Sequence, residues 1–195
     1  MKRFIAVLMM TALVALTLTA QSIGWKLDKA HSSVTFTVKH LVISEVRGNF
    51  KDFEIIMDST KENISDAVVG ATIRVASINT DNERRDGHLK SDDFFNAEKF
   101  PEITFKRASF EKVGDNFYRI NGDLTIRDIT KKVFFDAVYN GSLKTGQGTV
   151  AAWKATLVVN RFDYGLKWDG TIETGGVGHH PADSPPSPSP SPAAG

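Results

Sequence analysis

The sequence predicts an all-β protein, built as an antiparallel barrel or sandwich. Apolar and polar residues alternate with a period of two in short segments, and turn-forming residues separate neighbouring segments. No long amphipathic helix interrupts this pattern. We count about eight strands joined by short connections, which disfavours a βαβ arrangement because its crossovers need helices.

The first residues have the pattern of a secretory signal. Lys2 and Arg3 precede an apolar run over residues 4–18, and small residues follow at Ala20 and Ser22. We therefore expect a signal peptide over residues 1–20, and cleavage after Ala20 or after Ser22 fits equally. The run is too short for a stable membrane span. The sequence thus predicts a periplasmic or secreted protein.

The last residues, 178–195, are rich in proline and serine. This stretch holds all but one of the seven prolines of the chain. Proline cannot donate to a β ladder, so we expect polyproline II structure or disorder there. A single domain is expected over residues 23–177, which is long enough to bury a core.

Composition excludes several classes of partner and chemistry. The formal net charge is +1, without the basic excess that nucleic-acid binding proteins carry, so no nucleic-acid partner is expected. The chain has no cysteine, which excludes disulfides and thiol chemistry. Stability must come from the core, and 13 phenylalanines are available to fill it.

The alternating segments set the expected strand positions. A hairpin is expected around Gly114 and Asp115, since this pair tolerates positive φ. A turn is expected over residues 128–132 and a glycine-rich hairpin loop over residues 141–148. The expected strands cover 34–40, 46–57 with a change of phase, 67–79, 102–113, 116–129, 133–143 and 150–161.

The stretch from Thr80 to Phe105 is predicted to be a long loop that contains a short helix. The run Ser91-Asp92-Asp93 suits a turn or a helix N-cap, and Pro101 forces an extended chain before the next strand. Long loops in compact domains tend to be functional. Two compatible interpretations stay open: the loop merely covers one end of the barrel, or it frames the mouth of a pocket.

Seven motifs in register resemble those of the YceI-like family of exported, lipocalin-like proteins that bind polyisoprenoids. The resemblance covers about residues 25–176. The motifs are Trp25-x-Leu-Asp28 with His31-Ser32; Phe36-x-Val38-Lys-His40-Leu; Val46-x-Gly48-x-Phe50; Arg85-Asp-x-His88-Leu-Lys-Ser-x-Asp-Phe94-Phe; Phe100-Pro-x-Ile-Thr-Phe105; Gly122-x-Leu-Thr-Ile-Arg-x-x-Thr130-Lys; and Asn160-Arg-x-Asp163-x-Gly165.

The resemblance implies an eight-stranded antiparallel lipocalin-like barrel with a long hydrophobic channel for a prenyl chain or a similar lipid. One departure concerns the end of the barrel. After Gly176-Val177 the family continues with a final strand of alternating apolar residues, whereas here the Pro/Ser tail follows. Because proline cannot supply that ladder, the sequence leaves two possibilities: a barrel closed by a last strand, or a barrel without its closing strand.

Inward-facing apolar residues are the candidates to line such a channel, and ordinary core packing is the alternative role for each. The candidates are Phe36, Val38, Val46, Phe50, Ile73, Val75, Phe105, Leu124 and Ile126, with Phe94 and Phe95 from the long loop. A phosphate or carboxylate head group would need cations at the mouth, and Arg85 and His88 are the candidates among the basic cluster of that loop. The alternative is a solvated loop in which Arg85 pairs with Asp86, Asp92 or Asp93.

Neither catalysis nor metal binding is expected. We find no GxSxG turn, no HExxH helix and no phosphate-binding loop, and no histidine pair has zinc-site spacing. We predict a non-enzymatic carrier or store for an isoprenoid or other long-chain lipid, without a cofactor, as a monomer or homodimer. The alternatives are a surface interaction module with a solid core and, less favoured, a lipid-modifying enzyme.

Overall fold

The computed structural model describes residues 23–40, 44–61, 64, 66–166 and 168, and these residues form an almost entirely antiparallel β structure. The described strands are β1 (Ile23–Trp25), β2 (Val34–His40), β3 (Ser44–Phe50), β4 (Phe53–Ser59), β5 (Val68–Arg74), β6 (Ile78–Asn79), β7 (Glu102–Lys112), β8 (Phe117–Ile126), β9 (Ile129–Thr145) and β10 (Gly148–Thr156). The described helices are α1 (Glu83–Lys90) and two 3-10 turns, η1 (Val75–Ser77) and η2 (Arg161–Tyr164).

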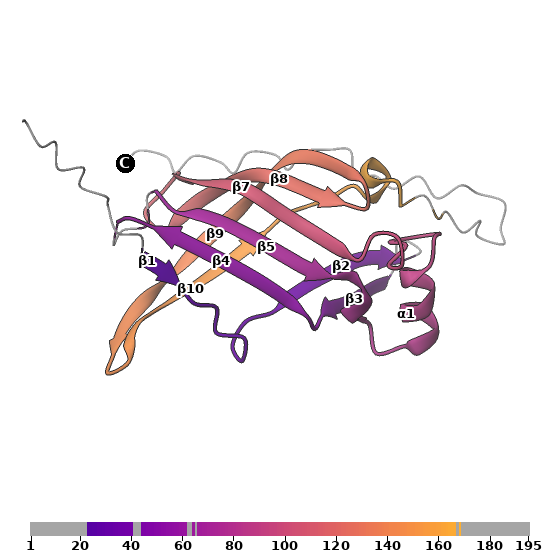
Figure 1. Cartoon of the computed structure of the whole chain (residues 1–195), viewed down its shortest axis with the longest axis horizontal. Helices are drawn as coiled ribbons and strands as arrows, with labels where there is room; N and C mark the ends of the chain where they lie inside the picture. The colour runs from indigo at the N-terminus through magenta and orange to yellow at the C-terminus, as the bar shows by residue number, and fades with distance from the viewer. Residues whose placement is uncertain (1–22, 41–43, 62–63, 65, 167, 169–195) are drawn as a thin grey trace, which may run out of the picture.

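The strands form two sheets. Seven strands pair in the order β1-β4-β5-β7-β8-β9-β10, and β2, β3 and β6 form a smaller sheet. The large sheet curls, so β9 and β10 lie behind β4 and β5 in Figure 1, while the small sheet and α1 stand together at one end. We call this end the α1 end. The predicted antiparallel all-β architecture with a short helix in the 80–100 loop is confirmed.

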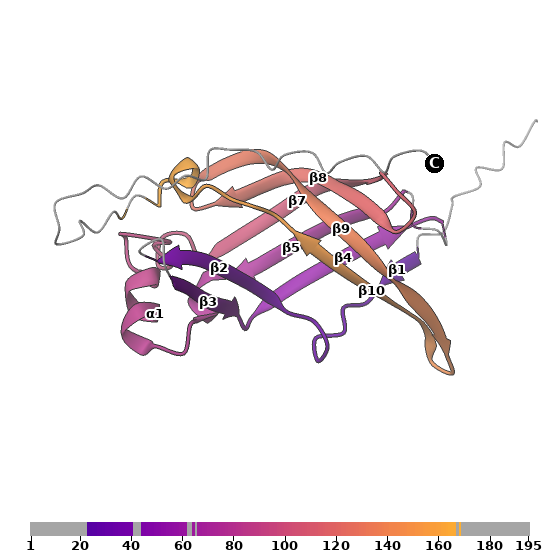
Figure 2. The ribbon, with the colours of Figure 1, turned by 180° about the vertical axis from the view of Figure 1, so that it is seen from behind.

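Two strands have an open edge on the same side of the molecule. In the described part of the chain, β10 pairs only with β9 and β2 pairs only with β3. Figure 2 shows both strands in front, with β4, β5 and β7 behind them. The predicted departure in the closing strand falls on residues 169–195, outside the described residues, as does the predicted signal peptide over 1–20.

Two predicted connections are shorter than expected. The expected turn over 128–132 is already strand, because β9 pairs with β8 from Ile129 onward, and only Arg127 and Asp128 form the turn. The expected loop over 141–148 is also mostly strand, since β9 runs to Thr145 and Gly146-Gln147 alone join it to β10. Positive φ values at Gly141 and Gly148 permit this ribbon without a longer loop.

The predicted strand over 67–79 is broken into β5, η1 and β6. β5 pairs with β4 and β7 in the large sheet, whereas Ile78 of β6 pairs with Phe50 in the small sheet. The 3-10 turn between them carries the chain from one sheet to the other. This crossing, together with the three-residue β1, explains why the described chain has ten strand segments where we expected about eight.

Helix α1 begins at a side-chain cap. The Asn82 side chain accepts a hydrogen bond from the Arg85 amide at 2.9 Å, and the free amides of the first turn are thereby partly satisfied. The predicted N-cap at 91–93 is wrong: Ser91 is the C-cap, and its amide donates to the His88 carbonyl. The alternative interpretation of this run as a turn is confirmed, because residues 92–95 form turns directly after the helix.

The core lies on the inner face of the large sheet at the α1 end. It includes Ile103 and Phe105 of β7 and Leu124 of β8, each less than 10% exposed. Gly122 permits close packing here, because a Cβ at this position would stand 2.6 Å from the Phe105 ring. In the described part of the chain, no helix is long and apolar enough to cross a membrane.

Candidate ligand-binding interior

Five of the predicted lining residues belong to the buried core. They come from β3, β7, β8 and the 3-10 turn η1, and they are between 1% and 9% exposed. They are Phe50, Val75, Phe105, Leu124 and Ile126. Their side chains contact one another and their neighbours, so the interior at the α1 end is filled by the protein itself. A role for them in ligand binding stays a prediction.

The other four predicted lining residues of the strands are less enclosed. Phe36 and Ile73 are partly buried and pack against the core, and the ring of Phe36 lies 5.6 Å from that of Phe50. Val46 is partly buried on β3. Val38 is 47% exposed, because it lies on β2 beside the open edge.

The predicted cation at the mouth, Arg85, is engaged by its own loop. Its Nε donates to Thr80 Oγ1 at 2.7 Å, and its Nη2 donates to the Thr80 carbonyl at 2.7 Å. The buried carboxylate of Asp86 accepts from the Thr80 amide at 2.9 Å and from its hydroxyl at 2.5 Å. The alternative interpretation paired Arg85 with Asp86, Asp92 or Asp93; Arg85 instead donates hydrogen bonds to Thr80, and these close the loop.

His88, Phe94 and Phe95 divide between the surface and the core. His88 Nε2 lies 2.9 Å from Asp93 Oδ2, and its ring packs edge-on against Phe94 at 5.1 Å and Trp168 at 4.8 Å. Phe95 turns inward instead and packs edge-on against Phe50 at 6.1 Å. The loop therefore closes the α1 end with Phe95 and presents an aromatic cluster at its outside.

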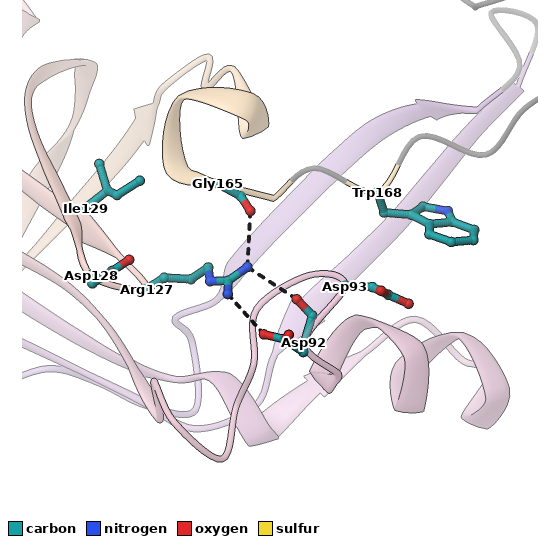
Figure 3. A pocket seen from close by; sticks show the side chains of 7 residues that line it. All are labelled: Asp92, Asp93, Arg127, Asp128, Ile129, Gly165 and Trp168. Atoms are coloured by element: carbon teal, nitrogen blue, oxygen red, sulfur yellow. Dashed lines mark hydrogen bonds and ion pairs between the residues drawn. The ribbon is translucent and has the colours of Figure 1, made fainter.

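A pocket of about 590 Å³ lies beside this cluster (Figure 3). Arg127 is its central side chain and is held by four acceptors: the carbonyls of Asp92, Phe94 and Gly165 at 3.1–3.3 Å, and Asp92 Oδ1 at 3.1 Å. The other charged groups of the pocket wall are carboxylates, so its charge does not suit an anionic head group. The pocket is lined by Asp92, Asp93, Arg127, Asp128, Ile129, Gly165 and Trp168.

Beyond the core, the inner face continues into an aromatic cluster that is only partly buried. We call it the inner aromatic cluster: Phe110 of β7, Tyr118 of β8, Tyr139 of β9 and Trp153 of β10. Trp153 is at its centre, with ring centroids 5.0 Å from Tyr118, 4.8 Å from Tyr139 and 5.6 Å from Phe110. These rings lie away from the α1 end and beside the open edge of β10.

The indole of Trp153 has a donor without an acceptor. Its Nε1 is buried and has no hydrogen-bond partner among the described residues. Buried indole N–H groups usually find a partner, and leaving one unpaired costs about 1–3 kcal/mol.

Sequence reasoning missed the inner aromatic cluster, although a signal for it was present. Tyr118 shares the period-two face of the predicted lining residues Leu124 and Ile126. Trp153 in turn pairs with Tyr139 across the β9–β10 ribbon. Following each inward face to the end of its strand would have added these rings to the prediction.

A curled antiparallel sheet with an apolar inner face and partly buried aromatic rings has the architecture of a lipocalin-like fold. In the described part of the chain, no group of three or more His, Asp or Glu residues could hold a metal ion.

Comparison with known proteins agrees with this class. The family model described as "YceI-like domain" matches residues 25–180, and the chain belongs to that family. The family is lipocalin-like and polyisoprenoid-binding. A similar curated relative is the UPF0312 protein SA2479 of Staphylococcus aureus (strain N315), 41% identical over 152 residues, which cover 77% of this chain and 86% of the relative.

Solved structures show the same fold. The chain is similar to the crystal structure of the Campylobacter jejuni YceI protein, with a TM-score of 0.59, 37% sequence identity, and coverage of 72% of this chain and 83% of that one. It also resembles Burkholderia cenocepacia BcnA, with a TM-score of 0.63 and coverage of 70% and 82%. The identity to BcnA is 22%, so that likeness concerns the fold alone.

Proposed function

We propose that this protein binds an isoprenoid or other long-chain lipid on its inner face, and that it carries or stores this guest without transforming it. The N-terminal sequence supports a place of action in the periplasm or outside the cell. The membership of a polyisoprenoid-binding family supports the class of guest.

The observation that carries the proposal is the inner aromatic cluster. Its four rings belong to neighbouring strands and contact one another, yet they stay partly exposed. Aromatic side chains of this size are the main source of apolar contact area in proteins. A set that is left partly open on the concave side of a sheet is therefore suited to an apolar guest.

The energy available from such a guest fits reversible carriage. Burying one methylene group contributes about 0.8 kcal/mol, so a chain of about ten buried carbons contributes about 8 kcal/mol. This corresponds to a dissociation constant of about 1 μM before the cost of association is subtracted. Affinity would rise with the length of guest chain that is enclosed, because each methylene group contributes. The filled interior at the α1 end limits that length.

The rival candidate is an interaction module with a solid core. At the α1 end the interior is filled, with Val75 at 1% and Phe105 at 6% exposure, and this packing favours the interaction module. The partly exposed cluster around Trp153 favours the carrier instead, because a solid core would cover these rings.

The test compares one inner and one outer aromatic residue. Tyr118→Asp places a carboxylate in the inner aromatic cluster, whereas Phe134→Asp places one on the outer face of β9, where Phe134 is 49% exposed. Binding of farnesol, a short isoprenoid alcohol, is followed by tryptophan fluorescence in buffer without lipid vesicles. Circular dichroism melts confirm that both variants are folded.

The proposal predicts saturable farnesol binding by the wild type and by Phe134→Asp, and at least a tenfold weaker affinity for Tyr118→Asp. Burying a charged carboxylate beside an apolar chain is strongly unfavourable, which is the basis for this loss. Equal affinity of the two variants, or no binding by any of the three proteins, would favour the interaction module.

A further inference from the structure

We propose that Asn140 is a site of spontaneous deamidation in the folded protein, and that the isoaspartate formed there loosens the tip of the β9–β10 ribbon. This modification is independent of the proposed lipid binding. It concerns a part of the chain to which the proposed function assigns no role.

The chain contains two Asn-Gly pairs, Asn121-Gly122 and Asn140-Gly141. Asparagine followed by glycine is the pair most prone to deamidation, because glycine has no Cβ to hinder the attack of its amide nitrogen on the asparagine side chain. The sequence alone does not distinguish the two pairs. Their surroundings in the structure do.

Asn140 is the extra residue of a β-bulge. Across the ribbon Tyr139 pairs with Trp153 and Gly141 pairs with Ala152, so two consecutive residues of β10 face residues two apart on β9 and Asn140 has no Cα partner. The extra residue of a bulge is left outside the ladder, and its strand bends there. Asn140 is also exposed, and a Cβ at Gly141 would meet nothing within 4 Å. Neither pairing nor packing therefore holds this Asn-Gly pair.

The bulge lies where the ribbon leaves the rest of the sheet. β8 pairs with β9 only as far as Phe117 opposite Val138, and over residues 140–145 β9 has β10 as its single described neighbour. This part of the ribbon is the extension at the lower left of Figure 1. A two-stranded ribbon is marginal on its own and opens locally at low cost. Asn140 can therefore reach a reactive conformation while the rest of the fold stays intact.

Asn121 is fixed on both sides. It is partly buried within β8, opposite Ser109 of β7 and Phe134 of β9. The space beside Gly122 is already filled, since a Cβ there would stand 2.6 Å from the Phe105 ring. Cyclisation at Asn121 needs β7, β8 and β9 to separate, which is close to global unfolding. The structure thus protects one Asn-Gly pair and leaves the other open.

The reaction is a cyclisation followed by hydrolysis. The Gly141 amide nitrogen loses its proton and attacks Cγ of Asn140, the Cγ–Nδ2 bond breaks, and the amide group leaves as ammonia with the proton it gains. Water then opens the succinimide ring at either carbonyl. One opening gives aspartate with a normal main chain, and the other gives isoaspartate, whose main chain is longer by one carbon. Both products carry a new carboxylate, and water is the only co-reactant.

The longer main chain of isoaspartate disturbs the ribbon beyond the bulge. The pairs Gly141–Ala152 and Leu143–Val150 depend on the register that the bulge sets, and an added carbon shifts it. Every residue from 142 to 150 is exposed, so little burial opposes the loss of pairing. Lys144 lies in this tip and is a cleavage point for trypsin.

The test follows both Asn-Gly pairs in the full chain, folded and unfolded. Protein is incubated at mildly alkaline pH, in buffer or in urea, and is then digested with trypsin. Each pair falls in its own peptide: residues 133–144 contain Asn140 and residues 120–127 contain Asn121, each as the single asparagine. Mass spectrometry measures deamidation, and chromatography separates the aspartate and isoaspartate products. A sample digested at time zero corrects for reaction during digestion.

We expect the two peptides to deamidate at similar rates in urea, because both pairs are Asn-Gly. In the folded protein we expect Asn140 to react at least tenfold faster than Asn121. Equal rates in the folded protein would overturn the proposal, because the fold would then not select the site. An unmodified 133–144 peptide from folded protein would overturn it as well.

A second measurement tests the loosened ribbon. Brief trypsin treatment of folded protein should cut after Lys144 at least threefold faster in the isoaspartate fraction than in fresh protein. Asn140→Asp is the matched control, because it adds the same charge on a normal main chain, and it should be cut like fresh protein. If the isoaspartate fraction and Asn140→Asp are cut at the same rate, the proposed loosening of the ribbon is wrong.

Discussion

Replacing Gly122 by alanine should destabilise the protein through a clash that cannot relax. A Cβ at this position would stand 2.6 and 2.7 Å from two atoms of the Phe105 ring and 2.8 Å from the Lys106 carbonyl oxygen. The ring is 6% exposed and packs edge-on against Phe135 at 4.9 Å, so it cannot swing aside without breaking that contact. The carbonyl belongs to a paired strand and is fixed as well.

Overpacking of this kind typically costs about 1–3 kcal/mol. For a domain of this length, about 1 kcal/mol corresponds to roughly 2–4 °C in the melting temperature. We therefore expect Gly122→Ala to melt roughly 3–10 °C below the wild type. Differential scanning calorimetry at neutral pH measures the shift.

Gly87 supplies the matched control. It lies in α1, and a Cβ there would meet nothing within 4 Å. Because alanine has the higher helix propensity, Gly87→Ala should stabilise by up to about 1 kcal/mol. If Gly122→Ala melts at or above the wild-type temperature, the packing of Phe105 against this backbone is not as described.

Three further predictions concern stability. Arg127→Asn tolerates the positive φ of 57° but loses the four contacts that join the β8–β9 turn to the 92–94 loop and to Gly165; we expect a loss of about 2 kcal/mol in urea unfolding. Asn82→Ala removes the α1 N-cap and should cost about 1 kcal/mol, with faster amide exchange confined to that helix. Hydrogen bonds from Ser59, and to a lesser extent from Thr60, hold the pKa of Asp66 well below its ordinary value. The ionised carboxylate therefore stabilises the fold at neutral pH, and this contribution is lost as pH falls below about 4. Asp66→Asn should flatten the acid side of the stability profile measured by urea unfolding.

Each of these has a result that contradicts it. An Arg127→Asn protein with wild-type stability would mean that the hydrogen bonds from the guanidinium to the three carbonyls contribute nothing to the free energy of unfolding. Exchange that accelerates throughout the barrel in Asn82→Ala would show that the cap is not local. An unchanged acid profile in Asp66→Asn would show that the folded carboxyl has an ordinary pKa.

The strand pattern could be predicted because each strand is half buried. The turn pair Gly114-Asp115 placed the hairpin between β7 and β8, and alternation with a period of two gave the facing of β2, β3 and β8. The ends of β9 could not be predicted from turn residues, since Gly141 and Gly148 adopt positive φ within the ribbon instead of forming a loop. The break after Arg74 was also hidden, because Val75 continues the apolar pattern while the chain changes sheets.

The candidate site was predicted only in part. Sequence alternation identified the inward faces but not which positions along them are filled, so Phe50 and Phe105 were treated like residues that stay open. Enclosure depends on how far the sheet curls and on what covers each end, and neither is encoded in a single strand. The charge of Arg85 was visible in the sequence, but its use by the Thr80 backbone depends on the fold of the loop.

The most direct test of the central claim is native mass spectrometry of the protein purified from its own host, followed by lipid extraction. We expect an additional mass that is released on denaturation and recovered as an isoprenoid or other long-chain lipid, and that is greatly reduced in Tyr118→Asp. Protein that is always empty, and that takes up no added lipid, would contradict the claim that the inner face binds a guest.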